Sequence, residues 1–274
     1  MRILAASPVR QKPEILSEYG ISLLNLKTHG IQVSFLFIDD NISLDSSLVL
    51  QNIARALKGT VLKAGSLLAP EYMKEDNKPY SRHKWNRIST FRVGELRNRI
   101  LEYARDRDFD GLFFVDSDLL LHPDTLKHLI ELDKDIISEI YWTRWSHAGP
   151  LCPQVWLYDN YTQYEMKGEE LFNAGQIRER TQKFYDMLRK PGVYKVGGLG
   201  GCTLLSKKVL HSKVSFTPIY NLSFNGEDRH FCVRAAVNGF ELYVDTTYPA
   251  YHIYRDSDLP GCKEFKKMCA YAQT

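Results

Sequence analysis

Two carboxylates one residue apart, Asp116 and Asp118, directly follow the apolar residues 111–115. A short apolar run of this kind predicts a buried strand. Ligands of open α/β sheets bind outside the carboxyl ends of the strands, and alternation along a strand would turn both carboxylates to one side. Oxygen ligands in such a place suit Mg²⁺ or Mn²⁺ that carries a phosphate-bearing ligand. The pattern therefore predicts a metal–diphosphate site, although a D-x-D triplet alone also commonly caps a helix or a turn.

A second acidic pair, Glu227 and Asp228, opens a helix predicted over residues 227–238. Carboxylates in a first turn also stabilise the helix dipole, which is the structural alternative. At the ligand edge of a sheet, such a carboxylate can take a proton from an attacking hydroxyl. We expect Asp228 to be the general base and Glu227 to position the acceptor.

A late histidine and a glycine run complete the candidate site. His252 follows a strand predicted over 242–244, where a neutral imidazole would complete a metal shell with Asp116 and Asp118. A lone histidine is more often a packed or surface residue. Gly198 and Gly200, within Gly197–Gly201, permit close backbone approach and predict either a wall of the acceptor site or a flexible loop.

Basic and aromatic residues offer contacts to phosphate and sugar. Arg97 is the best candidate for a diphosphate contact, because its helix, predicted over 92–107, leads into the acid-bearing strand. Aromatic side chains near 141–156 are typical of sugar stacking or of a core. Further basic candidates are Arg10, Lys12, Arg92 and Arg99.

The predicted elements belong to the α/β class. A strand over 2–6, a helix over 14–28 and a strand over 33–38 imply a parallel pair with a right-handed crossover. We expect a mixed, mostly parallel central sheet flanked by helices. Further helices are predicted over 46–58, 123–132, 176–190 and 207–210, and further strands from 136 and over 202–205.

The composition is that of a soluble globule. The 274 residues carry a net charge of +3 and are 44% hydrophobic, which does not argue for nucleic acid. We expect one domain over 1–274, with a nucleotide-sugar-binding half (1–120) and an acceptor-binding half (121–274) whose segment 254–262 closes as a lid. No segment approaches a transmembrane span and no signal peptide is evident, so we expect a cytoplasmic protein, with attachment to a membrane surface left open.

Taken in order, these features resemble the glycosyltransferases of the GT-A fold and are similar to family 2. The resemblance covers roughly residues 2–252, and no single motif in it is specific. The matching pieces are Ser7-Pro8-Val9-Arg10, Asp39-Asp40-Asn41, Leu96-Arg97-Asn98, Val115-Asp116-Ser117-Asp118, Gly197–Cys202, Gly226-Glu227-Asp228 and His252.

The resemblance implies a role for each of these pieces. Pro8 and Arg10, with Asp39 or Asp40, would hold the nucleoside. Asp116, beside Ser117, would lie near the ribose or a metal-bound water, while Asp118 and His252 would ligate the metal. The glycine-rich loop would meet the donor sugar or the acceptor, and Asp228 would be the base.

The implied activity is metal-dependent sugar transfer of the hexosyltransferase class. A UDP- or GDP-sugar would be the donor, Mn²⁺ or Mg²⁺ the cofactor, and a glycan, a lipid-linked molecule or a protein the acceptor. Asp228 as base implies inversion, but the opening also resembles retaining mannosyltransferases. The strand-two acid is doubled and the Q-x-x-R-W motif is absent, so a processive synthase is not expected. The rival hypotheses are a nucleotidyltransferase, a phosphatase with an aspartyl nucleophile, and an inactive nucleotide-sugar-binding module.

Overall fold

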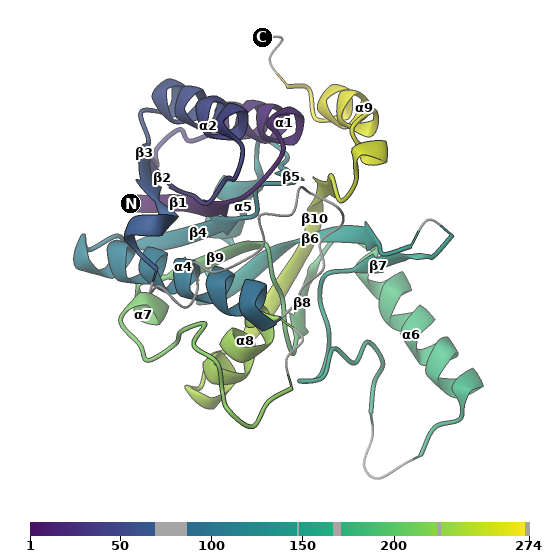
Figure 1. Ribbon diagram of the computed structural model, residues 1–274. Helices are drawn as coiled ribbons and strands as arrows, with labels where there is room; N and C mark the ends of the chain where they lie inside the picture. The colour runs from purple at the N-terminus through teal and green to yellow at the C-terminus, as the bar shows by residue number, and fades with distance from the viewer. Residues whose placement is uncertain (69–86, 147, 167–170, 224–225, 272–274) are drawn as a thin grey trace.

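One mixed sheet forms the centre of the molecule (Figure 1). The computed structural model describes residues 1–68, 87–146, 148–166, 171–223 and 226–271. Within them the strand order is β3-β2-β1-β4-β9-β6-β10-β5, with β7 beside β6 and β8 beside β10. The strands are β1 (Arg2–Val9), β2 (Gln32–Asp39), β3 (Thr60–Lys63), β4 (Gly111–Val115), β5 (Leu119–Leu120), β6 (Ile136–Arg144), β7 (Leu151–Pro153), β8 (Val193–Val196), β9 (Cys202–Ser206) and β10 (Leu242–His252).

The main strands share one direction. The pairs β1–β2, β1–β4, β2–β3 and β6–β10 are parallel, whereas β9 is antiparallel to both β4 and β6. The carboxyl ends of β1, β2, β4, β6 and β10 therefore lie along one edge of the sheet. Because β9 runs the other way, its beginning lies at that same edge. The fold thus gathers residues from distant parts of the chain where α/β sheets bind ligands.

Helices cover both faces of the sheet. In Figure 1, α1 and α2 lie on one side and α4, α7 and α8 on the other. The helix α6 extends away from the sheet, and α9 lies near α1. The helices are α1 (Pro13–Leu24), α2 (Leu44–Leu57), α4 (Arg87–Asp106), α5 (Thr125–Glu131), α6 (Ala174–Leu188), α7 (Lys207–Leu210), α8 (Glu227–Val237) and α9 (Gly261–Met268), with short 3₁₀ turns at Ala64–Ser66 and Asp256–Asp258.

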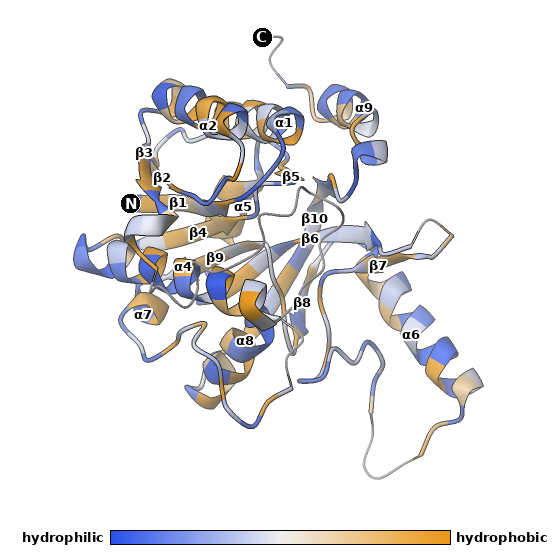
Figure 2. Ribbon diagram, in the orientation of Figure 1, coloured by the Kyte–Doolittle hydropathy of each residue, from blue (hydrophilic) through white to orange (hydrophobic). Residues whose placement is uncertain are grey.

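Two hydrophobic clusters, one on each face, hold the helices to the sheet. Leu96, Ile100 and Ala104 of α4 are buried on one face, with spacings of four residues that match one side of a helix. Leu16 of α1 and Leu50 of α2 are buried on the other face. Figure 2 shows the hydrophilic residues that α1, α2 and α4 also carry.

The structure confirms the mixed α/β class and corrects several predicted bounds. The first strand continues through Pro8 to Val9, where a loop was expected; β1 pairs with β4 only as far as Ala6, so a missing N–H at Pro8 is tolerated. Pro123 was expected in the first turn of a helix, but α5 begins at Thr125. The last strand runs from Leu242 to His252, much further than predicted, and β3, β5, β7 and β8 were missed.

Candidate functional site

The candidate site lies at the edge where the parallel strands end. Asp116 follows the last residue of β4, and the first residue of β9, Cys202, pairs with Val115. The Asp116 backbone N–H donates to the Gly201 carbonyl at 2.7 Å. The acidic motif and the glycine-rich loop, far apart in sequence, are therefore adjacent.

The two carboxylates of the acidic motif lie in a turn. The Leu119 N–H donates to the Asp116 carbonyl at 3.1 Å, so the strand alternation expected for Asp116 and Asp118 does not apply. The short strand β5 pairs with the end of β10, with Leu119 opposite His252. This pairing brings the Asp118 Oδ2 atom to 3.5 Å from the His252 Nε2 atom. Two of the three predicted metal ligands, Asp118 and His252, are thus neighbours.

The other nitrogen of His252 is also engaged. Its Nδ1 atom lies 2.8 Å from the Thr143 Oγ1 atom, which in turn accepts a hydrogen bond from Gln154 Nε2 at 3.0 Å. A hydroxyl oxygen has two lone pairs and can accept from both neighbours. With Nδ1 as the donor, the Nε2 atom would present a lone pair beside Asp118 to a metal. Such outer partners orient histidine ligands in metal sites. No pattern in the sequence pointed to Thr143.

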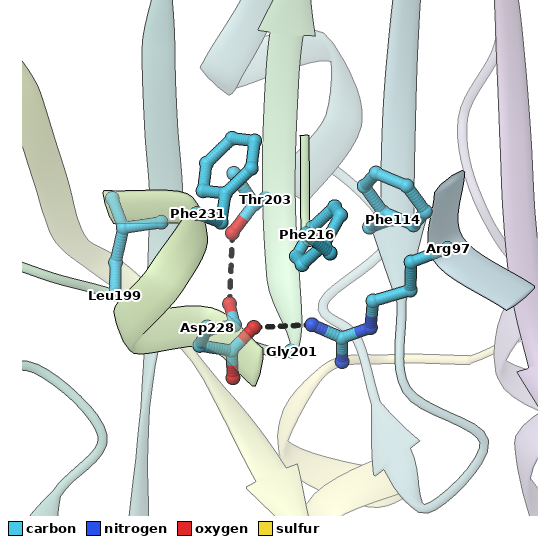
Figure 3. Close-up of a pocket in the computed structure, with 9 residues that line it drawn as sticks. Arg97, Phe114, Leu199, Gly201, Thr203, Phe216, Asp228 and Phe231 are labelled. Atoms are coloured by element: carbon cyan, nitrogen blue, oxygen red, sulfur yellow. Dashed lines mark hydrogen bonds and ion pairs between the residues drawn. The ribbon is translucent and has the colours of Figure 1, made fainter. Parts of the chain in front are cut away.

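Arg97 joins the acidic motif to the acidic pair of α8. Its guanidinium, from the middle of α4, binds Asp116 at 2.7 Å, lies 3.4 Å from a Glu227 oxygen and also pairs with Asp228 (Figure 3). The Arg97 side chain is only 5% exposed and lies over the ring of Phe216. In the sequence Arg97 was a candidate for a diphosphate contact, and here its partners are carboxylates.

Burial and like charge shift the proton affinities of these groups. Burial alone would lower the pKa of Arg97, but Asp228, Asp116 and Glu227 outweigh it and hold that pKa well above its ordinary value. Burial raises the pKa of Asp116 and of Asp228, while Arg97 opposes the rise in both. Burial together with the Asp228 charge raises the pKa of Glu227 to about 8. The cluster therefore sets three carboxyl groups against one guanidinium, and burial favours their protonated forms.

A divalent cation fits this arrangement in a limited way. Among the described residues, no group of three or more His, Cys, Asp or Glu side chains is arranged to hold a metal ion. Asp118 and His252 offer one oxygen and one nitrogen, while Asp116, predicted as a further ligand, is bound by Arg97. Mg²⁺ commonly takes one or two protein ligands and completes its shell with water and substrate phosphates. The pair fits a cation of that kind.

The glycine-rich loop is packed tightly. A Cβ atom on Gly198 would overlap the Trp156 indole, and one on Gly200 would lie 2.6 Å from Asp228 Oδ2. Both glycines are buried, and Gly201 has a φ of +22°. The glycines allow the backbone to pass between Trp156 and the carboxylates. The close backbone approach expected of the run is present, and its role as a wall of the acceptor site stays a prediction.

A separate acidic pair lies at the end of β2. Asp39 accepts hydrogen bonds from Ser47 and Asn41 and pairs with Lys63. Asp40 pairs with Arg92 and lies 3.8 Å from Arg10. Burial tends to raise the pKa of Asp39, but Lys63 and the other donors outweigh it and lower that pKa. Of the other candidates for binding the nucleoside, Pro8 is half-buried and Ser117 is buried.

The predicted lid contacts the edge of the sheet near this site. Arg255 donates to the carbonyls of Arg144 and Trp145, both at 2.6 Å. Lys12 pairs with Asp256 at 2.6 Å. Closure of this segment over a ligand stays a prediction.

Comparison with known proteins bears on the fold. No protein-family model and no curated protein matches the sequence. Among solved structures, S. aureus TarS (residues 1–349) matches with a TM-score of 0.50 and 15% identity, over 98% of this chain and 64% of that one. The mannosyltransferase PcManGT from Pyrobaculum calidifontis, in complex with GDP-Man and Mn²⁺, matches with a TM-score of 0.50 and 10% identity, over 98% of this chain and 61% of that one. This chain has the GT-A fold.

The GT-A resemblance seen in the sequence is thereby confirmed at the level of fold. The chain spans less than two thirds of the length of these structures. A TarS structure in complex with UDP also matches, with a TM-score of 0.50 and 14% identity. In the described part of this GT-A chain, no helix is both long enough and apolar enough to cross a membrane.

Proposed function

We propose that this protein is a metal-dependent glycosyltransferase that moves a sugar from a nucleotide diphosphate sugar to an acceptor hydroxyl. One observation carries the proposal. Asp118 of the turn after β4 and His252 at the end of β10 lie 3.5 Å apart, beside the Arg97 cluster that contains Asp116 and Asp228. The structures of similar fold include one with GDP-Man and Mn²⁺ and one with UDP.

Asp228 is the proposed general base. Arg97 binds its Oδ1 atom and so fixes the orientation of the carboxylate. Its side chain is 27% exposed, which leaves it reachable by an acceptor. Its raised pKa brings it closer to the working pH, where a base transfers protons most effectively. An acceptor hydroxyl that loses its proton to Asp228 attacks the anomeric carbon from the side opposite the diphosphate and inverts its configuration.

Asp118 and His252 are the proposed protein ligands of Mg²⁺ or Mn²⁺. When bound, the cation supplies Lewis-acid neutralisation of the diphosphate charge. Thr143 orients His252, and Arg97 holds Asp116 in position to face the ribose or a bound water. Glu227, which the sequence led us to expect as a residue that positions the acceptor, is buried against Arg97, and we assign it instead to positioning that arginine.

The remaining assignments concern the donor. Arg10 and Pro8 at the end of β1, with Asp39, Asp40 and Ser117, are the proposed nucleoside side of the site. Asp39 and Asp40 are already paired with cations, so a nucleoside would have to take over one of their hydrogen bonds or contact the adjoining backbone. Gly198 and Gly200 are assigned to the backbone wall beside the transferred sugar.

A thermal-shift panel tests the proposal. UDP-glucose, UDP-N-acetylglucosamine and GDP-mannose are each added with and without Mn²⁺. A ligand that binds only the native state stabilises it by about 2.7 kcal/mol at a concentration of 100 Kd. We expect at least one nucleotide sugar to raise the melting temperature, and more so with Mn²⁺. Slow hydrolysis of that donor with Mn²⁺ separates an enzyme from an inactive binding module, and no shift with any donor contradicts the proposal.

A further inference from the structure

The Tyr141 hydroxyl lies among the carboxylates of the candidate site. Tyr141 belongs to β6, between β9 and β10, and is 7% exposed. A Cβ atom built on Gly201 would overlap the Tyr141 hydroxyl oxygen and would lie 2.7 Å from Asp116 Oδ2. One built on Gly200 would lie 2.6 Å from Asp228 Oδ2 and 3.7 Å from the Tyr141 hydroxyl. The hydroxyl is therefore close to both Asp116 and Asp228.

The Tyr141 ring is held in place by packing, whereas its hydroxyl is not held by a hydrogen bond among those described. The ring packs in the hydrophobic cluster of the α1–α2 face and meets the His252 ring edge-on, with centroids 5.2 Å apart. The hydrogen bonds recorded among the described residues include none to the Tyr141 hydroxyl. The hydroxyls of Tyr185 and Tyr251, by contrast, donate to Gln163 and to the Asp258 carbonyl. Since none of these hydrogen bonds engages it, the Tyr141 hydroxyl can donate to a ligand oxygen.

The hydrogen-bonding capacity of the neighbouring carboxylates and of Arg97 indicates what the Tyr141 hydroxyl can contribute to ligand binding. Ionised carboxylates only accept hydrogen bonds, and the terminal nitrogens of Arg97 already pair with Asp116 and Asp228. A sugar hydroxyl both donates and accepts, so a sugar bound here needs a donor as well as the carboxylates. The Tyr141 hydroxyl is such a donor. It lies close to Asp116 and to Asp228, the proposed base.

We propose that the Tyr141 hydroxyl binds the transferred sugar of the donor, by donating a hydrogen bond to one of the sugar's oxygens between Asp116 and Asp228. This inference rests on the function proposed above and adds a residue that selects the sugar part of the donor. The nucleoside and the diphosphate would be held elsewhere in the site.

The test compares Tyr141→Phe with Tyr185→Phe. The affinities of both variants for UDP-N-acetylglucosamine, GDP-mannose, UDP and GDP are measured by calorimetry with Mn²⁺, and their melting temperatures without ligand. We expect Tyr141→Phe to keep or raise the melting temperature, to bind the nucleotide sugar roughly 3- to 10-fold more weakly, and to bind the nucleoside diphosphate as the wild type does. Tyr185→Phe, which loses the hydrogen bond to Gln163, should melt earlier and keep both affinities.

Each other outcome counts against the inference in a recognisable way. Unchanged nucleotide-sugar affinity in Tyr141→Phe overturns the role of the hydroxyl but leaves the proposed function standing. Equal weakening for the nucleotide sugar and the nucleoside diphosphate overturns the assignment to the sugar. A wild type that binds none of these ligands overturns both the inference and the proposed function.

Discussion

Two acidic clusters lie at the same edge of the sheet, and their charges are balanced differently. At the end of β2, Asp39 and Asp40 face three cations, Lys63, Arg92 and Arg10. At the end of β4, Arg97 is shared by three carboxylates, those of Asp116, Glu227 and Asp228. The pKa of Asp39 is lowered. Burial raises the pKa values of Asp116, Glu227 and Asp228, and neighbouring carboxylates add to the rise at Asp116 and Glu227.

In the cluster at the end of β2 the cations are at least as many as the carboxylates, and we call this cluster matched. In the Arg97 cluster the carboxylates outnumber the cation, and we call this cluster unmatched. The matched cluster gains nothing from a further cation or proton. The unmatched cluster can take up a proton or a divalent cation, and perturbed carboxylates of this kind are typical of functional sites. The Arg97 cluster and the adjoining pair of Asp118 and His252 are therefore where chemistry is expected, and the β2 cluster is where a ligand is expected to be held.

The largest predicted effect is the loss of transfer in Asp228→Asn. The amide cannot accept the proton of the acceptor, and general-base help is typically worth about 10²–10⁴-fold in rate. Transfer is measured by release of the nucleoside diphosphate, and donor affinity by calorimetry, which should stay nearly unchanged. Asp186→Asn, on the exposed surface of α6, is the matched control. Full transfer by Asp228→Asn would remove Asp228 from the mechanism.

The next effect is on stability. Replacing Arg97 with Met leaves three carboxylates without their shared cation, and breaking a buried pair in this way costs about 3–5 kcal/mol. Urea unfolding at pH 8 measures the free energy of unfolding. Arg99→Met, on the same helix with a 41% exposed side chain, should change it by less than about 0.5 kcal/mol. Equal stability of the two variants would show that the Arg97 cluster is not held by charge.

A smaller effect concerns the orientation of His252. Thr143→Val removes the hydroxyl that lies 2.8 Å from His252 Nδ1. Loss of such an outer partner typically weakens metal binding by about 10–100-fold. Mn²⁺ affinity in the presence of UDP or GDP is the measurement, and Thr162→Val, in the loop after β7, serves as a control. An unchanged affinity in Thr143→Val would mean that Thr143 does not orient a metal-binding His252.

A further comparison of the two clusters uses two pH dependences of opposite sign. The folded-state pKa of Glu227 is raised from about 4.5 to about 8, so its contribution to stability is present below the lower value and is lost as the pH rises to the higher one. Glu227→Gln should flatten the fall in melting temperature over that range. The pKa of Asp39 is lowered from 3.8, so its contribution is lost in acid, and Asp39→Asn should flatten the acid limb. Melting curves from pH 3 to about pH 9 compare the two, and equal slopes in variants and wild type would contradict these assignments.

Local patterns predicted the parts of the site that depend on neighbours in sequence. The junction of an apolar strand with Asp116 and the position of Asp228 in the first turn of a helix follow from runs of a few residues. The GT-A fold was predictable because several such runs occur in order. The contact of Asp118 with His252 was a hypothesis, and it depends on the pairing of β5 with β10, which the sequence pattern did not predict.

The partners of those residues could not be predicted, and β10 shows why. Its apolar pattern stops at Val244, and polar residues with Pro249 follow, so the sequence predicted a strand that ended there. The structure continues it, with a shift of register between Asp245 and Ala250. That irregularity determines where His252 lies, and hence that Thr143 and Tyr141 are its neighbours.

Binding of Mn²⁺ with and without a nucleoside diphosphate tests the central claim most directly. The electron paramagnetic resonance signal of free Mn²⁺ is followed as protein is added, for the wild type and for Asp118→Asn. Because Asp118 and His252 supply only two ligands, we predict weak binding of Mn²⁺ alone, much tighter binding when UDP or GDP is present, and loss of that gain in Asp118→Asn. Binding that is the same with and without nucleotide, or that Asp118→Asn leaves intact, would contradict the account.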